Sequence, residues 1–177
     1  IEMLVGVIEQ RDAYTAGHTR RVAHYCVSIA RQMQIDEGSV ARLREAAILH
    51  DIGKVIIPDS VLLKPGRLTR KEYDLIKAHL TVGYQILSRI DYYKPLAEII
   101  LCHHEKFDGS GYPGGKKGDE ISLLSHIMIV ADAFGWEQTL GGAVGAALMQ
   151  GIKRGLFSNE AGMGSAPNAA ATAHVSH

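Results

Sequence analysis

The chain has 177 residues, with 19 basic and 19 acidic side chains, 46% apolar residues, nine histidines and two cysteines. A formal net charge of zero provides no field that would gather phosphate backbones, so sequence-independent binding of DNA or RNA is disfavoured. Two cysteines, Cys26 and Cys102, cannot form a disulfide scaffold, and we therefore expect a cytoplasmic protein.

Residues 1–134 are predicted to be helical, because their apolar residues recur at intervals of three and four. The first helix starts near Thr19. Thr69 and Glu72 have the spacing of a capping box and open the third helix. The apolar positions of the five expected helices are Val22, Tyr25, Cys26, Ile29, Ala30 and Met33; Leu43, Ala46 and Ala47; Leu75, Ile76, Leu80, Gly83, Ile86 and Leu87; Leu96, Ile99 and Ile100; and Leu124, Ile127, Met128 and Ala131.

Four of these apolar stripes each contain one polar residue: His50, His79, His103 and Asp132. A buried carboxylate costs several kcal/mol unless a partner compensates it. A single histidine on an apolar face is more often a hydrogen-bonded core residue than a ligand. Antiparallel helices around one core would bring all four side chains together, however, and clusters of this kind bind metal ions. The four positions therefore predict a metal site.

The order of the polar motifs is more specific than any one of them. In chain order the motifs are His18, His50-Asp51-Ile52-Gly53-Lys54, His79, His103-His104-Glu105, Gly111-Tyr112-Pro113 inside a glycine-rich loop, and Val130-Ala131-Asp132. This order closely resembles the HD-GYP family, the bacterial phosphodiesterases that hydrolyse the second messenger cyclic di-GMP. That family lies within the HD superfamily of metal-dependent phosphohydrolases. The resemblance covers residues 1–134.

The resemblance implies an all-α bundle that holds divalent metal ions. The implied ligands are His18, His50, Asp51, His79, His103, His104 and Asp132, with Asp51 bridging two ions. Some family members have a glutamate four residues before the first histidine that serves a third metal, but Tyr14 stands there in this chain. We therefore expect two metal ions. Imidazole and carboxylate ligands favour iron or manganese, and a pair of such ions can activate a water for attack on a phosphodiester.

The resemblance also assigns roles around the metals. Lys54 would lie beside the scissile phosphate, and with Asp51 it would form the catalytic pair. Gly111, Tyr112 and Pro113 would contact the substrate, a cyclic dinucleotide, or a signalling partner such as a diguanylate cyclase. Tyr73 and Phe107 are predicted to be packing residues.

The composition changes after residue 134. Residues 1–134 hold 34 of the 38 charged side chains, whereas 135–177 hold 4 and are rich in glycine and alanine. The segment Gly151 to Pro167 reads GIKRGLFSNEAGMGSAP, which resembles the sodium-coupled alanine/glycine symporters. The longest uncharged, largely apolar run before Lys153 has 15 residues, fewer than the roughly 20 of a membrane-spanning helix.

We therefore expect a C-terminally truncated HD-type domain at 1–134, with no membrane association. Residues 135–177 are expected to be a symporter-like fragment that is not an independent domain, joined to the first part as a chimera. A divergent helix that completes the domain natively is the alternative. Truncation would weaken metal binding and turnover.

Three further functions stay open. The chain could be a catalytically silent signalling module, or a nucleotide phosphohydrolase of the same superfamily with another substrate. A transporter role is suggested only by residues 135–177, and this sequence does not contain the membrane-spanning helices that a transporter needs.

Overall fold

The structure is a computed structural model that describes residue 6, residues 10–11 and residues 17–137. Within this part of the chain all regular elements are helical, which confirms the predicted all-α class. The elements are α2 (His18–Gln32), α3 (Glu37–Leu49), η2 (Ile52–Ile56), α4 (Asp59–Leu62), α5 (Arg70–Leu87), η3 (Asp91–Tyr93), α6 (Lys94–Leu101), η4 (Gly118–Glu120) and α7 (Leu123–Glu137). The described residues fall almost wholly in one compact unit, Ile1–Trp136.

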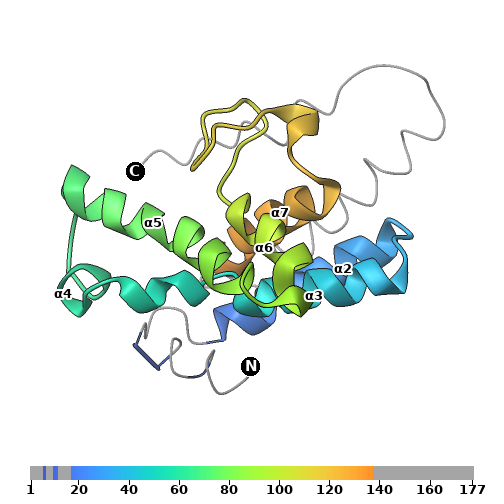
Figure 1. Ribbon diagram of the computed structural model, residues 1–177, viewed down its shortest axis with the longest axis horizontal. Coiled ribbons are helices and arrows are strands. Elements are labelled where there is room, and N and C mark those ends of the chain that lie inside the picture. The colour runs from blue at the N-terminus through green and yellow to red at the C-terminus, as the bar shows by residue number, and fades with distance from the viewer. Residues whose placement is uncertain (1–5, 7–9, 12–16, 138–177) are drawn as a thin grey trace. The chain divides into compact units, whose positions relative to one another are not determined.

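Helices α2 and α3 pack against each other, α6 packs on α3, and α5 packs on both α6 and η2 (Figure 1). Side-chain hydrogen bonds cap two of these helices. The Asp36 carboxylate accepts from the Ser39 backbone at the start of α3, at 2.9 Å. The predicted capping box opens α5, because the Thr69 hydroxyl accepts from the Glu72 backbone and the Glu72 carboxylate accepts from the Thr69 backbone.

The core joins apolar side chains to an unusual set of buried polar ones. Its largest buried apolar residues are Leu43, Ile57, Leu80, Leu96, Ile100 and Met128. Among them lie four histidines, His18, His50, His79 and His103, each no more than 1% exposed. No helix among the described residues has the length and apolar character needed to span a membrane.

Two of the expected helices end before their histidines. His50 is the residue that follows α3, and His103 lies two residues beyond the end of α6. The last carbonyl groups of a helix lack partners within the helix, so a nearby donor can take them. The imidazole of each histidine supplies that donor, as described below, and the helix end itself therefore positions the ring.

A close backbone contact fixes η2 against α5. A Cβ atom on Gly53 would lie 2.7 Å from the backbone nitrogen of Gly83, and closer still to the carbonyl oxygen of His79. Only glycine allows this approach. The contact sets the distance between the loop that carries Asp51 and the helix that carries His79.

We predict that Gly53→Ala lowers the free energy of unfolding by about 2 kcal/mol or more, because the added methyl group must push the two backbones apart. Gly83→Ala is the matched control on the other side of the same contact. A Cβ there meets its nearest neighbours at 3.4 Å or more, an ordinary contact. Chemical denaturation of both variants would check this, and equal stability of the two would show that the contact is not constraining.

Candidate metal centre

Three of the buried imidazoles are oriented in the same way. In each, Nδ1 lies within hydrogen-bonding distance of the backbone carbonyl three residues earlier: His50 with Ala47 at 2.7 Å, His79 with Ile76 at 2.6 Å and His103 with Ile100 at 2.6 Å. A carbonyl oxygen only accepts, so Nδ1 carries the proton and Nε2 of a neutral ring carries a lone pair. For His79 and His103, Nε2 is buried without a hydrogen-bond partner.

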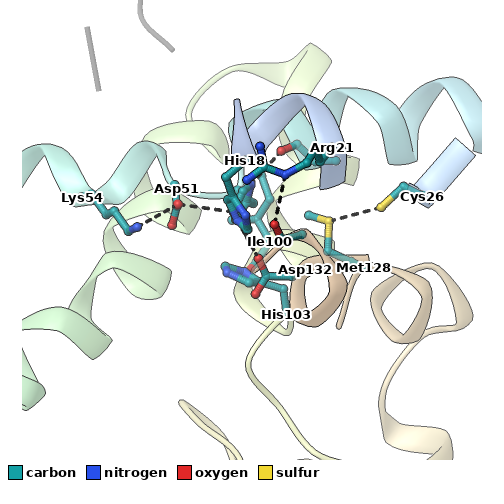
Figure 2. Close-up of polar contacts among 12 residues, drawn as sticks. His18, Arg21, Cys26, Asp51, Lys54, Ile100, His103, Met128 and Asp132 are labelled. Carbon is teal, nitrogen blue, oxygen red and sulfur yellow. Dashed lines mark hydrogen bonds and ion pairs between the residues drawn. The ribbon is translucent and has the colours of Figure 1, made fainter. Parts of the chain in front are cut away.

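The ring nitrogens and carboxylate oxygens of seven residues converge at one place. Potential ligand atoms lie within 4.8 Å of one another in three groups: His79, His103 and His104; His18, His50 and Asp132; and His50, Asp51 and His103. The groups share His50 and His103 and so form one continuous cluster. Figure 2 shows His18, Asp51, His103 and Asp132 approaching the same point from different elements.

Asp132 projects from α7 into this cluster. Its Oδ1 lies 3.0 Å from Nε2 of His18 and 3.6 Å from Nε2 of His50. Burial alone would raise the pKa of Asp132, but the hydrogen bond from His18 and the nearby histidines outweigh it and lower the pKa. The carboxylate is therefore ionised at neutral pH, which suits it to bind a cation.

The two oxygens of Asp51 face different neighbours. Oδ2 lies 2.9 Å from Nζ of Lys54 and 3.3 Å from Nε2 of His50, whereas Oδ1 lies 3.7 Å from Nε2 of His79. Burial would raise the pKa of Asp51, but His50 and Lys54 hold it well below its usual range. An ionised carboxylate with its oxygens turned in two directions can serve two cations at once.

The imidazoles differ in charge according to their neighbours. Burial lowers the pKa of three imidazoles: that of His79 falls, that of His103 falls well below its usual range, and that of His104 falls to about 4. These rings are therefore neutral, which is the form that binds metals. Burial also opposes a charge on His50, but Asp51 and Asp132 outweigh it and raise the pKa of His50 to about 9. Positive charge is thus favoured between the two carboxylates.

This donor set fits divalent metal ions. A buried imidazole nitrogen without a hydrogen-bond partner destabilises the folded protein unless a ligand binds it. The two ionised carboxylates nearby attract a cation. The donors of the cluster are imidazole and carboxylate, with no thiolate among the groups found in the described residues. Imidazole and carboxylate groups are common ligands of divalent transition metals.

The glycine-rich loop lies against the cluster. A Cβ on Gly111 would come within 2.5 Å of the backbone of Glu105, so the loop can pass there only with glycine. The Tyr112 backbone donates to the carbonyl of His104 at 3.1 Å, and its ring stacks on the His104 ring with centroids 5.2 Å apart. Gly111 and Tyr112 therefore adjoin the cluster, whereas Pro113 is an exposed residue of the loop.

Two residues near the site received no role from the sequence analysis. Glu105 is 1% exposed, and its carboxylate accepts hydrogen bonds from the backbones of Gly114 at 2.7 Å and Lys116 at 3.1 Å. Its position directly after two histidines and before a glycine-rich loop is the signal that could have found it. Gly135 lies beyond the expected domain end, yet a Cβ there would come within 2.9 Å of the His18 ring.

Tyr73 and Phe107, which we expected to be packing residues, do not lie in the core. They are 45% and 66% exposed, respectively. Each ring nevertheless has an aromatic neighbour: the centroid of Tyr73 lies 6.3 Å from that of Tyr112, and the centroid of Phe107 lies 5.9 Å from that of His126.

We predict that Glu105→Gln destabilises the loop. The glutamine side chain would place an NH2 group, which donates, where a carboxylate oxygen now accepts from a backbone N–H, and the negative charge that strengthens both hydrogen bonds would be lost. The expected cost is about 1–3 kcal/mol in the free energy of unfolding. Limited proteolysis should cut the loop of Glu105→Gln sooner than that of wild type. Asp119→Asn, an exposed change in η4 directly after the loop, is the control. Equal cleavage of the two variants would contradict a fastening role for Glu105.

The structure resembles solved phosphodiesterase structures in fold. The HD domain of the Listeria monocytogenes phosphodiesterase PgpH aligns with a TM-score of 0.59 at 18% identity, covering 89% of this chain and 83% of that one. A cyclic GMP-AMP-specific phosphodiesterase of Vibrio cholerae aligns with a TM-score of 0.55 at 20% identity, covering 77% and 39%. At these identities the likeness establishes the fold.

Curated relatives match more closely in sequence. A 3'3'-cGAMP-specific phosphodiesterase of Vibrio cholerae is 45% identical over 128 residues, which is 72% of this chain and 28% of the relative. A cyclic di-GMP phosphodiesterase of Thermotoga maritima is 47% identical over 138 residues, 76% of this chain and 37% of the relative. The chain thus matches well under half the length of either relative.

Two family models match different parts of the chain. The sodium:alanine symporter family matches residues 121–177, which confirms the resemblance of the C-terminal segment. The HD domain model matches residues 2–147, so the two matches overlap and the boundary at residue 134 stays a prediction. The cluster of histidines and aspartates lies within the residues that the HD domain model matches. Because that match covers most of the sequence, this chain belongs to the HD domain family.

Proposed function

We propose that this chain binds two divalent metal ions and hydrolyses a cyclic dinucleotide, with cyclic di-GMP as the expected substrate. The observation that carries the proposal is the cluster of buried imidazoles around two ionised carboxylates. The names of the curated relatives, which include cyclic di-GMP and cGAMP phosphodiesterases, support the substrate class. The Gly111-Tyr112-Pro113 sequence beside the cluster supports the HD-GYP type.

The proposed metal ligands are the seven residues of the cluster: His18, His50, Asp51, His79, His103, His104 and Asp132. Iron or manganese is the expected metal. When bound, two such ions would acidify a water molecule and neutralise charge on the phosphoryl oxygens. Asp51 would be shared between them, a role for which its two oxygens, each with different neighbours, are suited.

Lys54 is the residue proposed to meet the phosphate. Its Nζ pairs with Asp51 at 2.9 Å, so a cation already stands at the edge of the cluster. An ammonium group is a compact charge that can donate to a phosphate oxygen. Lys54 would hold the scissile phosphate against the site, and hydrolysis would open the ring to the linear dinucleotide pGpG or go on to GMP.

A silent signalling module is the second candidate. The observation that favours it is the change of sequence family near α7, the helix that supplies Asp132. We propose that this change weakens metal binding and turnover. In a silent module, the exposed Pro113 side of the loop would bind a signalling protein such as a diguanylate cyclase.

For both candidate functions we propose action in the cytoplasm. A nucleotide phosphohydrolase with another substrate would be revealed by a substrate panel.

We predict that the purified full chain, loaded with manganese or iron(II), retains about two metal ions and slowly hydrolyses cyclic di-GMP. Asp51→Asn should lose at least one of the two ions and all detectable hydrolysis, because one carboxylate oxygen is replaced by an amide. Elemental analysis and chromatography of the products measure the two effects.

His24→Ala is the matched control, since His24 is an exposed histidine of α2 outside the cluster. It should retain wild-type metal content. Lys54→Met should keep its metal but lose hydrolysis. Failure of the wild-type chain to retain metal would refute the metal centre, and metal retention without turnover on any nucleotide would select the silent module.

A further inference from the structure

Two side chains on one face of α5 extend the site away from the metal cluster. Tyr73 and Lys77 are one helical turn apart, and both approach Tyr112 of the loop. The rings of Tyr73 and Tyr112 have centroids 6.3 Å apart in an edge-to-face arrangement. Nζ of Lys77 lies 5.2 Å from the centroid of Tyr73 and 5.9 Å from that of Tyr112. We call these three residues the α5 wall.

The wall is continuous with the cluster. Tyr112 stacks on His104 at 5.2 Å, and His104 contacts the ring of His79 at 5.4 Å. A row of rings therefore runs from the metal centre to Tyr73 at the surface. A ligand with a phosphate at the cluster and a second group beyond it would meet this row.

The chemistry of the wall matches that second group. Tyr73 is 45% exposed, which leaves its aromatic surface available for stacking. Lys77 pairs with Asp74 at 2.6 Å, but the two side chains are 33% and 55% exposed, and such solvated pairs hold a lysine only weakly. An aromatic surface beside a partly exposed cation is the combination that binds a nucleobase and a neighbouring phosphate.

We propose that the α5 wall is a substrate subsite, which takes a purine base and the phosphate of the cyclic dinucleotide that is not being cleaved. This proposal rests on the proposed function. The base would stack on the exposed Tyr73 ring, with the Tyr112 ring edge-on beside it, and Lys77 would attract the phosphate. The wall would then favour cyclic dinucleotides over simple phosphodiesters, which reach the metal centre but have no base to stack.

The test is an equilibrium titration of the metal-loaded full chain with cyclic di-GMP, together with measurement of KM. Tyr73→Ala should raise Kd and KM by about 5- to 100-fold, the range observed when a stacking aromatic is removed. Tyr73→Phe should restore binding, because it retains the ring. Lys77→Glu should also weaken binding, more strongly at low salt, since its contribution is electrostatic.

Tyr92→Ala is the matched control. Tyr92 is 68% exposed and its hydroxyl donates to Glu45, away from the cluster. It should leave Kd unchanged, and thermal unfolding should show that all variants are folded. If wild type binds cyclic di-GMP and Tyr73→Ala binds it equally well, the subsite is wrong and the proposed function stands. If wild type binds no cyclic dinucleotide, the proposed function fails and the subsite fails with it.

Discussion

The hydrogen bonds from imidazole Nδ1 to backbone carbonyls determine what the centre of this molecule can do. Each fixes one buried ring of His50, His79 or His103 with the other nitrogen directed into the cluster. Two of the carbonyls belong to the ends of α3 and α6, where a helix has unpaired acceptors. The same bonds thus orient the three rings, and in the neutral rings of His79 and His103 they leave a lone pair on Nε2.

The carboxylates complete the site through charge. Asp51 and Asp132 stay ionised despite burial, because the histidines and Lys54 surround them. Removing an ion-binding residue here would leave a buried charge without a partner, which is costly. Around this polar centre, close glycine contacts at Gly53 and Gly111 and the buried carboxylate of Glu105 hold the adjoining segments in place. The glycine-rich loop is thus held in place directly after the histidine pair, His103 and His104.

The sequence was sufficient to predict the helical class and the meeting of His50, His79, His103 and Asp132. Periodicity reports which face of a helix is buried, and polar residues on buried faces must share partners. Other features depend on which elements meet in space. No periodicity reveals that Glu105 bonds two backbone donors of the following loop, that Gly135 touches His18, or that Tyr73 stays exposed beside Tyr112.

Anomalous diffraction from crystals of the full chain grown with manganese tests the central claim most directly. We expect two peaks about 3.5–4 Å apart, flanking Asp51 and bounded by the Nε2 atoms of the buried histidines. Peaks only at exposed carboxylates, or none among these imidazoles, would contradict it.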